Sequence, residues 1–183
     1  MKNNSSAGFS YIDVMIAIVI LTVGILALLS GISAAVVQSR GQEAQLNAKQ
    51  VAASTMESIM SLKETDPNRL GWITVGNVGT NPDPETGQFR GIFLNGERVV
   101  RTGAGPDEVL GTADDEGAII PNLTRQIEII DQCDPDRPSY NCPTPGPLEV
   151  RIRTVRVTVT YLIGQVRRQE VLTTVLSDYA VTE

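Results

Sequence analysis

A single uncharged, apolar segment near the start of the chain limits what this sequence can fold into. Between Asp13 and Arg40 there is no charged residue, and the sequence stays apolar to about Ala35. A helix needs roughly 20 apolar residues to cross a bilayer, so this segment is long enough to span one. Asp13 stands at its head. A carboxylate at the centre of a membrane helix costs on the order of 2.5–3.5 kcal/mol, so such a residue usually has a function and a partner.

Two general interpretations of this segment leave features unexplained. A cleaved secretory signal has several basic residues, an apolar core of about 7–15 residues and a small-x-small cleavage site. The polar head of this chain carries only Lys2, and its apolar core is longer. A plain membrane anchor fits the length but gives no role to Asp13 or to the junction between Gly8 and Phe9.

A third interpretation accounts for these features together. The stretch Gly8-Phe9-Ser10-Tyr11-Ile12-Asp13-Val14 resembles the cleavage and methylation motif of type IV prepilins and type II secretion pseudopilins, which reads Gly-Phe-Thr-Leu-Ile-Glu before an apolar helix. The resemblance covers about the first third of the chain. It implies that a prepilin peptidase cuts between Gly8 and Phe9 and methylates the new amino group of Phe9. It also implies an assembly role for Asp13, at a position where the family usually has Glu.

The resemblance also determines the expected location, because the flanking charges are weak evidence for orientation. Lys2 lies on one side of the segment, and Arg40 and Lys49 lie well beyond the other. The resemblance implies a cytoplasmic leader, a single pass through a bacterial inner membrane and a periplasmic C-terminal domain. The protein would then join a pilus or pseudopilus at the cell surface. The implied partners are the prepilin peptidase, other pilin or pseudopilin subunits and the inner-membrane assembly platform.

The helix is predicted to continue past the apolar segment. The first proline is Pro67, and Ala52, Met56 and Ile59 recur at helical spacing on one face. We therefore expect one helix from about Phe9 to Glu64. The predicted parts are a cleaved leader, the membrane or filament-core half of this helix, its amphipathic half and a globular β-sheet domain: residues 1–8, 9–35, 36–64 and 65–183.

The remainder of the chain predicts an α+β fold of the type IV pilin kind, in which the amphipathic half of the helix covers a small antiparallel sheet. Strands are indicated by alternating apolar residues over Leu123–Ile130, over 150–161 and over 171–175, with a turn at Ile163-Gly164-Gln165 between the last two. The apolar phase changes near Thr154, which predicts a bulge or a break between two strands.

The segment before these strands predicts mostly loop. Residues 71–91 are rich in Gly, Pro, Asn and Asp, so we expect at most a short strand at Trp72–Val75. Asn95-Gly96, between the apolar runs of residues 92–100, predicts a β-hairpin.

Cys133 and Cys142 predict a disulfide. Two cysteines in a chain without histidine make a poor zinc site. In an exported domain a disulfide is the default, and a loop this short gains roughly 2–3 kcal/mol from closure.

A glycine-rich acidic loop is a candidate for calcium, the one cofactor that the sequence suggests. Its carboxylates are Asp107, Asp114, Asp115 and Glu116. Such hard oxygen ligands on a flexible loop suit calcium. Their spacing does not match the Asp-x-Asp-x-Asp-Gly loop, so a solvated acidic loop is the alternative.

Composition argues against an enzyme and against nucleic-acid binding. The chain contains no histidine, no nucleophile elbow and no phosphate-binding loop. Its net charge of −6 opposes binding to phosphates, and only 4% of its residues are aromatic. The exception is a possible basic patch on the last hairpin, formed by Arg151, Arg153, Arg167 and Arg168.

Three functions follow from these expectations. The first is a structural subunit resembling PilV-like minor pilins, which prime assembly of a type IV pilus or lie at its tip. The second is a minor pseudopilin of type II secretion, which the N-terminal motif does not distinguish from the first. The third, of a different class, is an adhesin or DNA receptor at a pilus tip that uses the acidic loop or the arginine hairpin.

Overall fold

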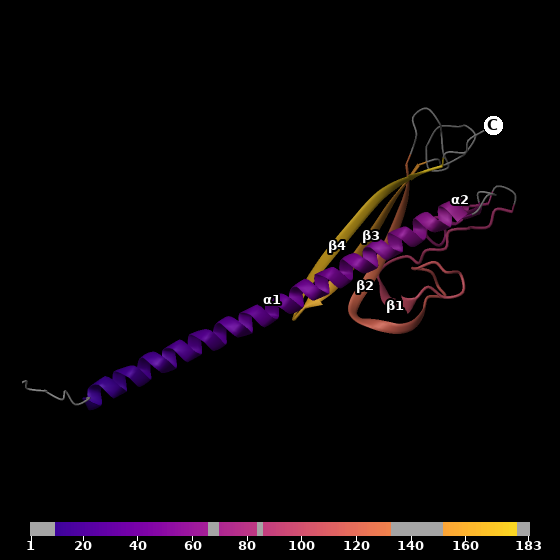
Figure 1. The fold of residues 1–183 in the computed structure, drawn as a ribbon. Coiled ribbons are helices and arrows are strands. Elements are labelled where there is room, and N and C mark those ends of the chain that lie inside the picture. Colours follow the sequence, from indigo (N-terminus) through magenta and orange to yellow (C-terminus); the bar gives the residue numbers. More distant parts are fainter. Residues whose placement is uncertain (1–9, 66–69, 84–85, 133–151, 179–183) are drawn as a thin grey trace, which may run out of the picture. The chain divides into compact units, whose positions relative to one another are not determined.

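The computed structural model describes residues 10–65, 70–83, 86–132 and 152–178. The described elements are two helices and four strands (Figure 1): α1 (Tyr11–Thr65), α2 (Leu70–Thr74), β1 (Arg98–Gly103), β2 (Glu116–Gln132), β3 (Ile152–Ile163) and β4 (Val166–Ser177). The chain divides into two compact units, Met1–Glu43 and Ala44–Glu183. The predicted processing and disulfide residues lie outside the described part of the chain: Gly8, Phe9, Cys133 and Cys142.

The prediction of one long helix is confirmed by α1. It contains 55 residues, and at 1.5 Å per residue this corresponds to about 80 Å. A helix pairs its backbone N–H and C=O groups within itself, so an apolar sequence of this kind can exist in lipid without unpaired groups. No proline interrupts the segment, and α1 ends at Thr65, two residues before Pro67.

The second half of α1 supplies one side of the hydrophobic core of the second unit. Ala48, Ala52, Met56 and Ile59 are buried at successive helical turns, and they belong to the same core cluster as Val157 in β3. Burial of a large aliphatic side chain contributes roughly 1.5–3 kcal/mol, so this stripe accounts for the packing of the helix on the sheet. The predicted α+β class, with an amphipathic helix half covering a sheet, is confirmed.

The sheet is an antiparallel meander in the order β1-β2-β3-β4. The pairing of β2 with β3 runs without a register shift from Leu123 opposite Tyr161 to Gln132 opposite Ile152. A two-residue turn joins β3 to β4, with Ile163 opposite Val166. Gly164 occupies this turn at a φ of 62°, in the left-handed region that favours glycine. The predicted turn is confirmed.

The predicted bulge or break near Thr154 is wrong. The pairing of β3 is regular on both sides, and its inward face reads Arg153, Val155, Val157 and Val159 without a change of phase. The apparent change arises because the inward position 153 holds an arginine, which the alternation rule assigns to solvent. Register shifts occur instead where β1 pairs with β2.

The described part of residues 71–91 is mostly loop, as predicted, and Trp72–Val75, where at most a short strand is expected, belongs to the short helix α2 and the bend that follows it. The prediction of a hairpin at Asn95-Gly96 is wrong. Asn95-Gly96 forms a bend with Gly96 at a φ of 75°, but it joins no two strands of one hairpin. Phe93, before the bend, bridges to Asn77 in the preceding loop, whereas β1, after the bend, pairs with β2.

Asn77 explains this arrangement. Its side-chain Nδ2 donates to the Ile127 carbonyl at 2.9 Å, and its Oδ1 accepts from the Ile129 N–H at 2.9 Å. These two backbone groups belong to the part of β2 that lies beyond its pairing with β1, which begins at Arg125. The buried amide thus takes the place of a neighbouring strand and satisfies groups that would otherwise lack a partner.

Candidate functional site

The first half of α1 is the most unusual surface of the molecule. Every residue from Tyr11 to Arg40 is exposed, including a continuous series of Ile, Leu, Val and Met side chains. Within the described residues, α1 is the one helix long and apolar enough to cross a membrane. Soluble proteins rarely expose apolar patches larger than a few hundred Å², and by its length and composition this surface is suited to a lipid bilayer or to contact with other protein chains.

Asp13 is the acidic residue in the first turn of this helix, and the structure gives its carboxylate a partner. The Ser10 backbone N–H donates to Asp13 Oδ2 at 3.2 Å, and the Ile12 N–H donates to Ser10 Oγ at 3.3 Å. This arrangement is a variant of the capping box, in which the Ser10 hydroxyl accepts from Ile12 rather than from Asp13, and its side chains satisfy N–H groups that have no partner within the helix. The Ser-x-x-Asp spacing would have revealed it from the sequence.

The capping box also shows how far the Asp13 side chain extends. Its carboxylate reaches back to the amide of Ser10, the residue that directly follows Phe9 in the chain. Asp is one methylene shorter than the Glu of the prepilin motif. In this structure the shorter side chain still reaches the N–H of Ser10.

The four acidic residues proposed for calcium are not brought together as a ligand set. Within the described residues, no group of three or more His, Cys, Asp or Glu side chains is placed to hold a metal ion. Asp107 and Asp114 instead organise the loop. Asp107 Oδ1 accepts from the Val109 N–H at 2.8 Å, and Asp114 Oδ1 accepts from the Thr112 hydroxyl at 2.6 Å. Glu116 begins β2 and is exposed.

The pKa of Asp107 is raised, whereas the pKa of Asp114 is lowered. Partial burial raises the pKa of Asp107, against the hydrogen bond from Val109. The Thr112 hydroxyl lowers the pKa of Asp114 by donating to its carboxylate. The pKa values of these two neighbouring carboxyl groups therefore shift in opposite directions.

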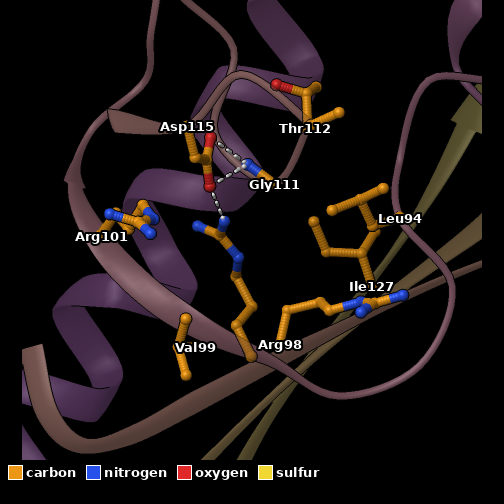
Figure 2. A pocket seen from close by; sticks show the side chains of 10 residues that line it. Leu94, Arg98, Val99, Arg101, Gly111, Thr112, Asp115 and Ile127 are labelled. Atoms are coloured by element: carbon orange, nitrogen blue, oxygen red, sulfur yellow. Dashed lines mark hydrogen bonds and ion pairs between the residues drawn. The ribbon is translucent and has the colours of Figure 1, made fainter. Parts of the chain in front are cut away.

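Asp115, unlike Asp107 and Asp114, forms a buried ion pair with Arg125 (Figure 2). Its Oδ2 lies 2.6 Å from Arg125 Nη2, and both its oxygens accept from the Gly111 N–H. Arg125 Nη1 also donates to the Thr55 hydroxyl of α1 at 3.0 Å. Burial lowers the pKa of Arg125, and the adjacent carboxylate opposes that shift. This network connects the acidic loop, β2 and the amphipathic half of α1.

A pocket of about 130 Å³ lies beside this ion pair. Arg98 and Arg101 line it, and their guanidinium groups donate to the carbonyls of Asn95 and Gly117. Figure 2 shows that these two side chains extend to opposite sides of the pocket. They therefore do not converge on a single small anion.

Arg153 forms a second buried network, on the inward face of β3. Its Nε lies 2.9 Å from Asp131 Oδ1, and its Nη1 donates to the Trp72 carbonyl. The guanidinium also stacks over the Trp72 ring, 4.4 Å from the ring centre. Burial lowers the pKa of Arg153, and Asp131 opposes that shift. These contacts attach α2 to the sheet.

The predicted basic patch on the last hairpin is therefore not assembled. Arg153 is buried, and Arg151 lies outside the described residues. Arg167 is paired with Glu97, whose Oε2 lies 2.6 Å from Arg167 Nη2. Of the four arginines, Arg168 is exposed and forms no ion pair with another described residue.

Replacement of Arg153 should be far more damaging than replacement of an exposed arginine on the same strand. Arg153→Met removes the ion pair with Asp131 and the contacts with the Trp72 ring and carbonyl, and it should lower the free energy of unfolding by about 3 kcal/mol. The matched control is Arg156→Met, because Arg156 pairs with Glu128 while both side chains are nearly half exposed. We expect that control to cost less than about 1 kcal/mol.

Trp72 provides the measurement, because it is the single tryptophan of the chain and is buried beside Arg153. Urea unfolding of the full chain in detergent, followed by its fluorescence, gives the free energy for each variant. Equal losses for the two arginine variants would contradict the assigned difference between a buried and an exposed ion pair.

Comparison with protein-family models, with characterised proteins and with solved structures finds no match.

Proposed function

We propose that this protein is a minor pilin, a structural subunit made as a precursor and incorporated into a type IV pilus. A prepilin peptidase cuts the precursor between Gly8 and Phe9 and methylates Phe9. The first half of α1 holds the subunit in the bacterial inner membrane, with the second unit in the periplasm, until assembly transfers the helix into the filament core. The subunit primes that assembly or lies at the filament tip.

Most of the support for this proposal comes from the continuity of α1. A single helix is apolar and fully exposed over its first half, and its second half contributes the core of a sheet domain. A simple membrane anchor has no need for such continuity, because a flexible linker can connect an anchor to its domain. Continuity is expected where one rigid helix must carry a domain at a set position along a filament.

The assigned role of Asp13 follows from the cost of an unpaired charge in an apolar environment. Among packed apolar helices, the amino group of Phe9 needs an anionic partner, because a single buried charge costs several kcal/mol. Asp13 of the same or a neighbouring subunit is the acidic residue within the apolar segment. Pairing between neighbours would set the axial register of the helices.

The second candidate, a minor pseudopilin of type II secretion, shares all these features. The third, a tip adhesin or DNA receptor, receives less support from the contacts. The arginine hairpin offers no assembled basic patch, because Arg153 is buried and Arg167 is paired with Glu97. The acidic loop is held by contacts with its own neighbours and with Arg125.

Deletion of the gene in its native host distinguishes the first two candidates. We expect the deletion to reduce the surface pili recovered by shearing, and a tagged copy to appear in the sheared pilus fraction at low abundance. Loss of protein export with normal piliation would instead identify a pseudopilin. If neither piliation nor export changes, the proposed function is wrong.

A further inference from the structure

Asn95 and Gly96 form an exposed bend just before β1. Both residues are exposed, and the φ of Gly96 is 75°, in the left-handed region that glycine adopts without strain. A Cβ atom added at Gly96 would meet no atom within 4 Å. The space around the peptide bond between Asn95 and Gly96 is therefore open to movement of the Asn95 side chain.

The hydrogen bonds of this bend leave one backbone group free. Among the described residues, none accepts a hydrogen bond from the Gly96 N–H. The Asn95 side chain makes one exposed hydrogen bond, from its Nδ2 to the Val78 carbonyl at 2.9 Å. Most backbone N–H groups in a fold are held by an acceptor, so a free N–H directly after an exposed asparagine is a distinctive combination.

The other half of the same peptide group contacts a cation. The Arg98 Nε donates to the Asn95 carbonyl at 3.2 Å. When the Gly96 N–H loses its proton to hydroxide, the negative charge is shared between the Gly96 nitrogen and the Asn95 carbonyl oxygen. A cationic donor at that oxygen stabilises the anion, because hydrogen bonds and opposite charges favour the charged form of a group.

We propose that Asn95 is a site of spontaneous covalent modification, at which the Gly96 nitrogen attacks the side chain and Arg98 promotes the attack. A bond forms between the Gly96 nitrogen and Asn95 Cγ, the bond from Cγ to Nδ2 breaks, and Nδ2 takes a proton from water and leaves as ammonia. The resulting succinimide ring is opened by a water molecule at either carbonyl. The products are aspartate and isoaspartate. This inference does not depend on the proposed function.

Either product alters the contact between the bend and the preceding loop. The Val78 carbonyl accepts from the Asn95 amide, whereas a carboxylate has no hydrogen to donate. Isoaspartate also redirects the main chain through the former side chain, directly before β1. The modification therefore loosens the attachment of the loop at Val78 to the sheet.

Four other asparagines each lack one of these features. Asn77 is buried, and the residue after Asn81 is a proline, which has no N–H to lose. Asn47 is exposed but lies within α1, where the next N–H is paired along the helix. Asn122 is exposed but is followed by a leucine, whose side chain obstructs the attack. Asn47 serves as the internal control.

Peptide mapping of the full chain, incubated in a non-ionic detergent at mildly alkaline pH, tests the proposal. Trypsin releases Asn95 in residues 91–98 and Asn47 in residues 41–49, and a sample digested before incubation gives the baseline. We expect both aspartate and isoaspartate at position 95, formed at least about tenfold faster than any change at Asn47, because glycine has no Cβ to obstruct the attack. The rate should rise with pH.

Two arginine variants test the assigned role of Arg98. Arg98→Met should slow the conversion by about threefold or more, because the anion loses its cationic donor. Arg101→Met is the matched control, since it removes the same charge from the same strand but its guanidinium donates to the Gly117 carbonyl. That control should convert at the natural rate. Unchanged Trp72 fluorescence checks the fold of each variant.

Three results would overturn the proposal. Conversion of Asn95 no faster than that of Asn47 would show that the bend does not favour the reaction. Aspartate without isoaspartate would indicate direct hydrolysis of the amide, with no attack by the Gly96 nitrogen. Equal rates in the Arg98 and Arg101 variants would remove Arg98 from the mechanism.

Discussion

Asp115→Ala should be one of the most destabilising single substitutions in the second unit, lowering the free energy of unfolding by about 3–5 kcal/mol. It leaves the Arg125 guanidinium, whose side chain is 3% exposed, without its carboxylate. It also removes the acceptor of the Gly111 N–H, which anchors the acidic loop. Urea unfolding of the full chain in detergent, followed by Trp72 fluorescence, measures the change.

Two further variants isolate the cause. Arg125→Met in the Asp115→Ala background should recover a large part of the loss, because removal of both charges leaves neither one buried alone. Asp114→Ala, at the exposed carboxylate next to it in sequence, should have a much smaller effect. A double variant as unstable as Asp115→Ala would show that the ion pair is not the source of the loss.

Asp13→Ala should reduce incorporation of the subunit into filaments by more than about tenfold. An amino group left unpaired among apolar helices costs several kcal/mol, and each 1.4 kcal/mol corresponds to about a factor of ten in an equilibrium constant. Membrane insertion and cleavage should remain largely intact, because the apolar segment and the junction are unchanged. Quantitative immunoblotting of sheared filaments against the membrane fraction measures the incorporation.

The capping box provides a means of separating two roles of Asp13. Asp13→Asn keeps an oxygen that can accept from the Ser10 N–H but removes the charge, whereas Ser10→Ala removes the other half of the cap and keeps the charge. If charge pairing drives assembly, Asp13→Asn should fail to assemble and Ser10→Ala should assemble. The reverse result would make Asp13 a helix cap without an assembly role.

Much of the fold follows from periodicity alone. The uncharged segment and the stripe containing Ala52, Met56 and Ile59 predict α1, and alternating residues predict β2, β3 and β4. Periodicity does not predict the burial of two arginines. Arg125 and Arg153 occupy inward positions in their strands, where ion pairs with Asp115 and Asp131 compensate for the burial of their charges. Neither partner can be identified from spacing along the chain.

The error between residues 70 and 100 has a related cause. A local signal such as Asn95-Gly96 predicts a hairpin only if both neighbouring segments pair with each other. In this chain Phe93 bridges to Asn77, and the amide of Asn77 occupies the edge of β2. A single buried side chain thus replaces the strand pairing that the local pattern predicts, through contacts some 50 residues apart in sequence.

Among the candidate site residues, the sequence predicted the importance of Asp13 but not its contact with Ser10. It grouped Asp107, Asp114, Asp115 and Glu116 by proximity along the chain, whereas the fold assigns Asp115 to Arg125 and leaves Glu116 exposed. Proximity in sequence fails there because the loop is held by backbone N–H groups and an arginine of β2, which have no signature in the loop itself.

Mass spectrometry of the mature protein, purified from a host that contains a prepilin peptidase, tests the central claim most directly. Cleavage after Gly8 predicts a chain that begins at Phe9 and carries one methyl group on its amino terminus. Gly8→Leu, which places a bulky side chain at the junction, should leave the precursor uncut and serves as the control. A natural chain that retains Met1, or that begins at a residue other than Phe9, would contradict the account.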